Sequence, residues 1–126
     1  ENPDYRLLKA HTPGPYTFIL RATHEVPRRL MHAKKRTIGI RVPDHPICQA
    51  LLRELGAPLM TSTLHLPDEE FPLTDPYDIE MALDGRVDLI IDGGHCGAEE
   101  TTVVSLDGDE GPEIVRTGAG PTDSIF

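Results

Sequence analysis

The residues best able to do chemistry in this chain of 126 residues are threonines and arginines near the ends of predicted strands. A hydroxyl donates and accepts hydrogen bonds, and a guanidinium pairs with carboxylates and phosphates through a fork of donors. Without a nucleophile–base pair, such groups suit a binding cleft for a carboxylate and phosphates. Threonine is also frequent in strands for packing reasons, so a structural role stays open. The set is Thr37, Arg41, Thr61, Thr63, Thr101, Thr102 and Arg116.

The spacing of histidines, glycines and cysteines does not indicate a metal site, a nucleotide-binding loop or a redox motif. The six histidines include no H-x-x-x-H or H-x-H pair, which argues against a metal site. Asp92-Gly-Gly94 is not G-x-G-x-x-G, and the chain has no Gly-Lys-Ser/Thr, so neither a Rossmann site nor a P-loop is expected. Cys48 and Cys96 form no C-x-x-C; we expect both to be buried as small apolar groups with reduced thiols, in a cytoplasmic protein.

Charge is distributed unevenly along the chain, whose formal net charge is −9. Residues 1–53 carry ten Lys/Arg against four Asp/Glu, whereas residues 54–126 carry two against seventeen. Six of the twelve cations fall between Arg28 and Arg41, and this part could attract nucleotide phosphates or RNA, or be a solvated basic loop. The acidic total argues against non-specific nucleic-acid binding. No apolar run approaches 18 residues, so no transmembrane helix is expected.

The elements that must position these residues are short and separated by Pro and Gly. In the predicted strand over residues 37–42, apolar residues alternate with Thr37, Gly39 and Arg41. Thr37 and Arg41 therefore share one face of the strand. Ile38 and Ile40 lie on the other face, where they are expected to be buried. The pattern predicts an α/β or α+β sheet with helices on at least one face. Helices are expected over 4–10, 26–31, 44–56 and 75–85, and strands over 17–23, 37–42, 58–62, 87–91, 101–106 and 113–117.

Six segments taken together resemble the YrdC/YciO-like family, which includes the threonylcarbamoyl-AMP synthases. Their order and spacing are similar to the C-terminal two-thirds of the family domain. Thr63-Leu64-His65, where synthases carry S-A-N, resembles the YciO branch. The segments are residues 13–20, 36–46, 55–63, 87–94, 100–104 and 114–118.

The resemblance implies a fold and an activity. The fold is a twisted mixed β-sheet flanked by helices around a concave cleft, in a single domain over residues 1–126 that is incomplete at its N-terminus. The activity is that of a nucleotidyltransferase which makes threonylcarbamoyl-AMP and pyrophosphate from ATP, L-threonine and bicarbonate, with Mg²⁺ accompanying ATP. The product supplies the t6A modification of tRNA.

The same resemblance implies roles for individual residues. ATP contacts fall to Thr37, Thr63 and Arg116, and L-threonine contacts fall to Arg41, Thr61 and Thr101. No metal-ligating residue is expected, and no residue is assigned as catalytic. The chemistry of the groups is compatible, since a bidentate Arg suits a carboxylate and a second Arg suits phosphate charge.

Two departures from the family pattern bear on activity. Thr63-Leu64-His65 departs from the polar S-A-N signature, since the Leu64 side chain can donate no hydrogen bond, and the N-terminal P-T-D-T-x-Y-G-L and K-x-R motifs are absent. We therefore predict that the 126-residue chain alone lacks synthase turnover, and that its open sheet edge favours self-association into a homo-oligomer. The alternatives are a non-catalytic protein of the YciO type that binds double-stranded RNA or tRNA, and an inert fragment.

Overall fold

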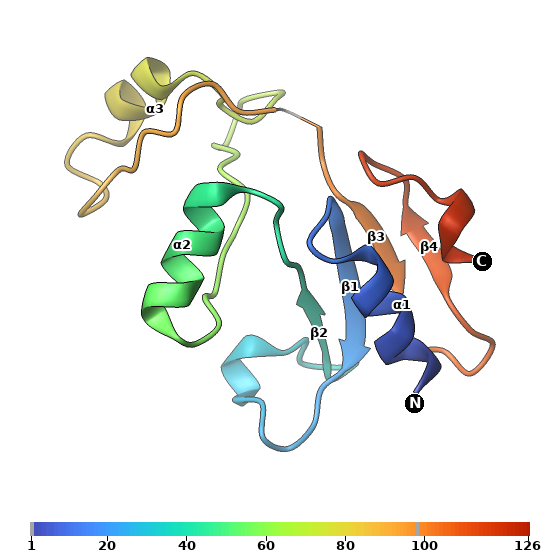
Figure 1. The fold of residues 1–126 in the computed structure, drawn as a ribbon. Helices are drawn as coiled ribbons and strands as arrows, with labels where there is room; N and C mark the ends of the chain where they lie inside the picture. Colours follow the sequence, from blue (N-terminus) through green and yellow to red (C-terminus); the bar gives the residue numbers. More distant parts are fainter. Residues whose placement is uncertain (1, 98) are drawn as a thin grey trace. The chain divides into compact units, whose positions relative to one another are not determined.

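The computed structural model describes residues 2–97 and 99–126 (Figure 1). It divides the chain into two compact units, Glu1–Pro58 with Glu100–Phe126, and Leu59–Glu99. The first unit contains the β-sheet and the second contains one helix with long irregular segments. The single domain expected over residues 1–126 stays a prediction.

Four strands form one mixed sheet in the first unit. They are β1 (Tyr16–Arg21), β2 (Thr37–Ile40), β3 (Thr102–Ser105) and β4 (Glu113–Arg116). The order across the sheet is β2-β1-β3-β4; β1 runs parallel to β3, and the outer strands run antiparallel to their neighbours. The mixed sheet implied by the family resemblance is therefore confirmed, and β3 and β4 form an antiparallel hairpin.

The strand directions bring distant parts of the sequence to one end of the sheet. The outer strands β2 and β4 end where the inner strands β1 and β3 begin (Figure 1). Arg41 directly follows β2, Arg116 ends β4 and Thr101 directly precedes β3. Topology alone thus places two arginines and a hydroxyl at the same end.

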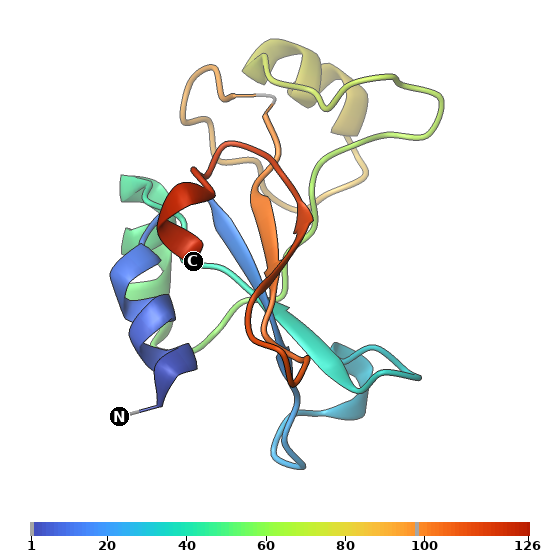
Figure 2. The same cartoon turned by 90° about the vertical axis from the view of Figure 1, so that its right-hand side faces the viewer.

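One face of the sheet carries the hydrophobic core. The register aligns Phe18 with Ile40 on one side and Val104 on the other, and both Phe18 and Val104 are fully buried. Tyr16 stacks on Phe18 with ring centroids 5.7 Å apart. The helix α1 (Pro3–His11) and the short 3-10 helix η2 (Asp123–Ile125) lie on this face (Figure 2), where Ile125 completes the core.

The N-terminal helix is fixed at both ends by hydrogen bonds. Asn2 Oδ1 accepts from the Asp4 backbone N–H at 2.7 Å, which caps the first turn of α1. At the other end, one ring nitrogen of His11 bonds the Leu7 carbonyl at 2.8 Å and the other bonds Ser124 Oγ at 2.9 Å. His11 therefore connects α1 to the C-terminal segment.

The helices α2 (Pro46–Leu55) and α3 (Pro76–Leu83) begin and end within two residues of the bounds expected from the sequence. The helix α2 begins after its N-cap His45 and ends at Gly56, whose φ of 67° is left-handed. In the second unit, α3 begins after Asp75, whose carboxylate accepts from the Tyr77 N–H at 2.9 Å. The helix expected over residues 26–31 is the shorter 3-10 helix η1 (Arg28–Leu30). No helix in the described residues is long and apolar enough to cross a membrane.

Two predicted strands are wrong. Among the described residues, 58–62 and 87–91 pair with no strand, and most of their apolar side chains are exposed, Met60 by 78% and Leu89 by 77%. Their composition favours extended structure, but a strand also needs a neighbour to receive its backbone hydrogen bonds. The expected burial of Cys96 is also wrong, since this residue is exposed, whereas Cys48 is half-buried.

Candidate functional site

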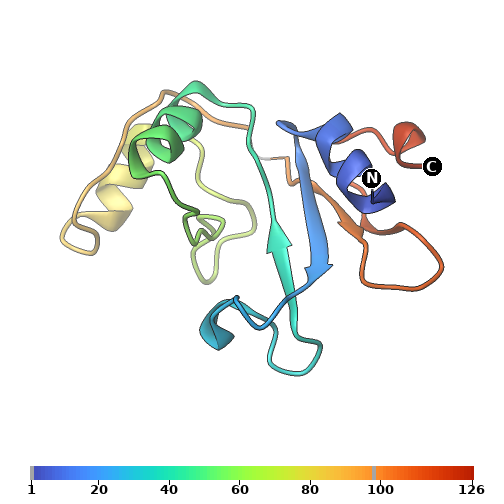
Figure 3. The same cartoon turned by 60° about the horizontal axis from the view of Figure 1, so that its bottom comes forward.

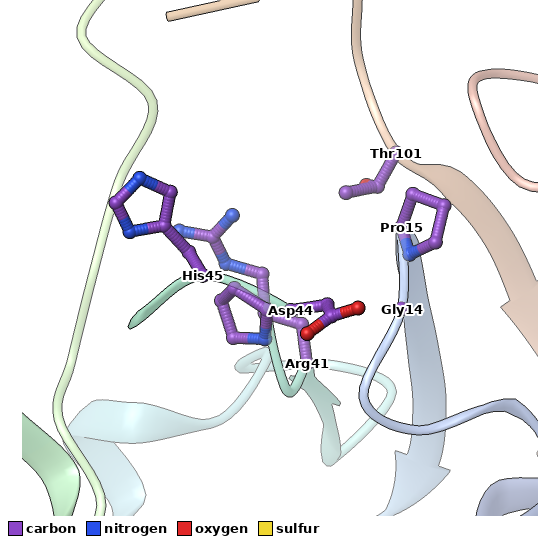
Figure 4. Close-up of a pocket in the computed structure, with 7 residues that line it drawn as sticks. Gly14, Pro15, Arg41, Asp44, His45 and Thr101 are labelled. Carbon is purple, nitrogen blue, oxygen red and sulfur yellow. The ribbon is translucent and has the colours of Figure 1, made fainter. Parts of the chain in front are cut away.

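A pocket of about 270 Å³ lies at the end of the sheet where β2 ends and β1 and β3 begin (Figure 4). All of its lining residues belong to the first unit. They come from the turn before β1, the segment between β2 and α2, and the residue before β3. The lining residues are Gly14, Pro15, Arg41, Pro43, Asp44, His45 and Thr101.

Arg41 reaches the pocket because of the two-residue period of β2. Ile40 packs against the core, so the next residue along the chain is directed to the opposite face. Gly39 shares that opposite face, and a Cβ built on it would lie 3.4 Å from Thr17 Cγ2. The pocket therefore adjoins the sheet face that α1 leaves uncovered. The burial expected for Ile38 and Ile40 is only partial, since both are half-buried.

The Thr101 hydroxyl stands at the centre of a small polar network. Its Oγ1 lies 2.7 Å from Thr17 Oγ1, across the parallel pair of β1 and β3. Arg116 Nη2 donates to the Thr101 carbonyl at 2.9 Å and to the hydroxyl oxygen at 3.2 Å. Since a guanidinium can only donate, Arg116 occupies one lone pair of Thr101 Oγ1. When the Thr17 hydroxyl also donates to Thr101 Oγ1, the Thr101 hydroxyl proton is available to an acceptor in the pocket.

The Arg116 side chain is held in place by contacts with Glu100 and Thr101. Its Nε also donates to the Thr101 carbonyl, at 3.1 Å, and its Nη1 lies 3.4 Å from a carboxylate oxygen of Glu100. The side chain is still 43% exposed. Arg116 is therefore not a lining residue of the pocket but a positively charged neighbour of it.

The segment from Pro43 to α2 is fixed by three hydrogen bonds. The Gln49 side-chain amide donates to the Pro43 carbonyl at 2.8 Å, and the Gln49 N–H donates to the His45 carbonyl at 2.9 Å. His45 Nδ1 accepts from the Ile47 N–H at 3.2 Å, so the proton of the neutral ring resides on Nε2. This places Asp44 and His45 at the pocket on an ordered support.

The structure places the six predicted site residues in different ways. Arg41 and Thr101 line the same pocket, and Arg116 contacts Thr101. Thr37 is buried at the start of β2, about 13 Å along the strand from Arg41 at about 3.3 Å per residue. Thr61 and Thr63 belong to the second unit. The ligand roles of all six stay predictions.

Three polar residues of this site carry no sequence motif that marks them as functional. Thr17 is two residues from the turn that lines the pocket, and alternation along β1 puts it on the face of Arg41. Asp44 and His45 appeared only as the beginning of a helix, although they stand three and four residues after Arg41. Thr102, in contrast, is fully buried and bonds to the backbone of residues 118 and 120, so its role is structural.

No group of three or more His, Cys, Asp or Glu side chains comes together within residues 2–97 and 99–126 in an arrangement that could hold a metal ion. The polar groups of the pocket are one guanidinium, one carboxylate, one imidazole and one hydroxyl. Such a set can bind a small polar ligand that carries an anionic group.

One protein-family model matches most of this sequence. The family Sua5_yciO_yrdC, described as telomere recombination, matches residues 1–118. The uncharacterized protein YciO of Escherichia coli K12 is 52% identical over 120 residues, which cover 95% of this chain and 58% of YciO. A threonylcarbamoyl-AMP synthase of Bacillus subtilis is 36% identical over 113 residues, which cover 89% of this chain and 32% of the synthase. The chain thus spans somewhat more than half the length of YciO.

Solved structures agree with the fold. The crystal structure of E. coli YciO matches all of this chain and 61% of that one, with a TM-score of 0.90 and 49% identity. The crystal structure of P. abyssi Sua5 complexed with L-threonine matches 99% of this chain and 37% of that one, with a TM-score of 0.84 and 27% identity. The α/β fold with a mixed sheet is therefore that of YciO and Sua5.

Proposed function

The chain belongs to the Sua5/YciO/YrdC family, and on that premise we propose that it binds L-threonine and ATP as part of a threonylcarbamoyl-AMP synthase-like protein. The observation that supports this most is the pocket itself, in which Arg41 and Thr101 meet from two strands. The family resemblance implies L-threonine contacts for both residues. A Sua5 protein of the same fold has been crystallised with L-threonine.

The pocket is better suited to an amino acid than to a nucleotide. Its volume of about 270 Å³ is at or below the lower end of the range of about 300–1,000 Å³ for small-molecule sites. The Arg41 guanidinium would receive the threonine carboxylate through two parallel hydrogen bonds. The Thr101 hydroxyl would donate to an oxygen of the L-threonine ligand. Thr17 and Arg116 would fix the orientation of this hydroxyl.

ATP would lie beside this pocket, next to Arg116. A phosphate oxygen there would compete with Glu100 for the guanidinium, which is still partly exposed. For Thr37 and Thr63, contact with ATP stays a prediction of the family resemblance alone, and Mg²⁺ would arrive on the triphosphate. In the proposed reaction the threonine nitrogen bonds to the carbon of bicarbonate with loss of water, and a carbamate oxygen then displaces pyrophosphate from the α-phosphorus.

Calorimetric titration of the chain with L-threonine tests this proposal. Arg41→Gln is expected to weaken binding by tenfold or more, because a charge-assisted hydrogen bond is worth about 1.5–3 kcal/mol. Arg53→Gln on the exposed side of α2 is the matched control and is expected to leave binding within about twofold. Equal affinities of the two variants would contradict the proposed carboxylate site.

A second candidate function is supported by a surface at the other end of the sheet. The loop between β1 and β2 carries five exposed cations and lies at the end opposite the pocket (Figure 3). His32 organises this loop, since its Nδ1 accepts from the backbone N–H groups of Lys34 and Lys35 at 3.2 Å each. The cations are Arg28, Arg29, Lys34, Lys35 and Arg36.

Binding of double-stranded RNA or tRNA through this loop would be independent of the amino-acid pocket. Its affinity would fall steeply with salt, because each phosphate contact releases a counterion. Replacing Lys34 and Lys35 by Gln would then reduce the slope of log affinity against log salt by about 2 and leave threonine binding unchanged. An unchanged slope would exclude these two lysines as phosphate contacts.

A further inference from the structure

We infer that Asp44 recognises the ammonium group of an L-α-amino acid, so that the pocket selects the zwitterionic head of its ligand. The inference rests on the proposed function for the amino-acid ligand, but it assigns a residue for which neither motif nor resemblance gave a role. Asp44 and Arg41 line the same pocket and carry opposite charges. An α-amino acid carries opposite charges separated by a single carbon atom.

The Asp44 carboxylate is placed to meet a ligand. In Figure 4 it extends from the segment after β2 toward Gly14 and Pro15, across the space that these residues line together. Within residues 2–97 and 99–126 it accepts no hydrogen bond and forms no ion pair. A carboxylate oriented in this way can accept from a ligand that donates.

The backbone around Asp44 is fixed on both sides. The carbonyl of Pro43 is bonded to the Gln49 side chain, and His45 caps α2. Little reorganisation is therefore needed when the carboxylate meets a ligand, which favours affinity.

The charge pattern also predicts which ligands are rejected. A phosphate or a 2-hydroxy acid could pair with Arg41, but it would bring no positive charge to Asp44 and would be repelled by it. Selection between an amino acid and a hydroxy acid of the same shape therefore depends on Asp44. Arg41 binds the carboxylate of both compounds alike.

A purely structural role for Asp44 predicts something different. Because Asp44 directly precedes the N-cap of α2, its negative charge also interacts favourably with the helix N-terminus. Loss of that interaction would change the stability of the protein. It would not change the ratio of affinities for two ligands that differ only in the amino group.

The test uses the 126-residue chain and two ligands, L-threonine and the 2,3-dihydroxybutanoate of the same configuration. Calorimetry measures both affinities for the parent chain, for Asp44→Asn, and for Asp109→Asn, which changes charge equally in the exposed β3–β4 turn. We expect D44N to weaken L-threonine binding about ten- to a hundredfold. Binding of the hydroxy acid stays the same or strengthens, and D109N changes neither affinity by more than about twofold.

The outcomes distinguish the assignment of Asp44 to the ammonium group from the proposed function, which is L-threonine binding. If the parent binds L-threonine and D44N weakens both ligands equally, or neither, the ammonium assignment is wrong while the proposed function stands. If the parent chain binds neither ligand, the proposed function and the assignment both fail. Thermal unfolding of each variant shows that the folded protein was titrated, and Asp44→Glu, which keeps the charge, is expected to retain most of the preference for L-threonine.

Discussion

Replacement of Thr102 by valine is expected to destabilise the first unit strongly, although the two side chains have nearly the same shape. Thr102 is fully buried on the core face of β3. Its hydroxyl donates to the Gly120 carbonyl at 2.7 Å and accepts from the Gly118 N–H at 2.9 Å. These two bonds attach the C-terminal segment to the strand that positions Thr101.

The magnitude follows from the burial of the two partners. Gly120 is buried, so its carbonyl would lose its hydrogen bond without access to water, at a cost of about 1–3 kcal/mol. Gly118 is half-buried, and water can replace part of the lost bond, at a cost of about 0.5–1.5 kcal/mol. Thr102→Val is therefore expected to lower the free energy of unfolding by about 1.5–4.5 kcal/mol. Thr102→Ser keeps both bonds and loses one methyl group, for about 1 kcal/mol.

Urea-induced unfolding followed by circular dichroism measures both variants under the same conditions. The expected order of stability is parent, then Thr102→Ser, then Thr102→Val. If the valine variant is as stable as the serine variant, or more stable, the hydrogen bonds of this hydroxyl do not hold the C-terminal segment, and the reasoning is refuted.

Two further predictions concern the supports of the site. Gly120→Ala is expected to cost about 1–3 kcal/mol of stability, because the new Cβ would lie 2.5 Å from the Tyr16 ring. Gly108→Ala is the control: no atom lies within 4 Å of its Cβ, and stability should change by less than about 0.5 kcal/mol. Equal melting temperatures of the two variants would contradict the close packing at Gly120. His45→Ala should cost about 1 kcal/mol through loss of the bond from the Ile47 N–H, and His45→Asn should restore most of it in a thermal melt; an alanine variant as stable as the asparagine variant would show that the cap contributes nothing.

Much of the first unit could be predicted from the sequence because its signals are local. The alternation of Ile38 and Ile40 with Gly39 identified β2 and the face from which Arg41 reaches the pocket. Gly56, which ends α2, needs only the neighbouring residues to be recognised. Signals of this kind can be recognised without knowing which strands are neighbours in the sheet.

The rest depends on partners that a single segment does not reveal. Residues 58–62 and 87–91 have the composition of strands, but pairing is a property of two segments, and neither pairs among the described residues. For the site, motif resemblance pointed to Arg41 and Thr101, and the strand directions explain why they meet. Asp44 carries no such signal, because a carboxylate near a helix start is common, and only its place in the pocket distinguishes it.

The central claim is that L-threonine binds at the end of the sheet where β2 ends and β1 and β3 begin. Amide chemical-shift mapping by NMR during titration of the labelled 126-residue chain with L-threonine tests it most directly. The largest shifts are expected at Gly14, Arg41 and Thr101, three residues distant in sequence that line one pocket. Shifts confined to the loop of residues 22–36 at the opposite end of the sheet, or no shifts at saturating L-threonine, would contradict the account.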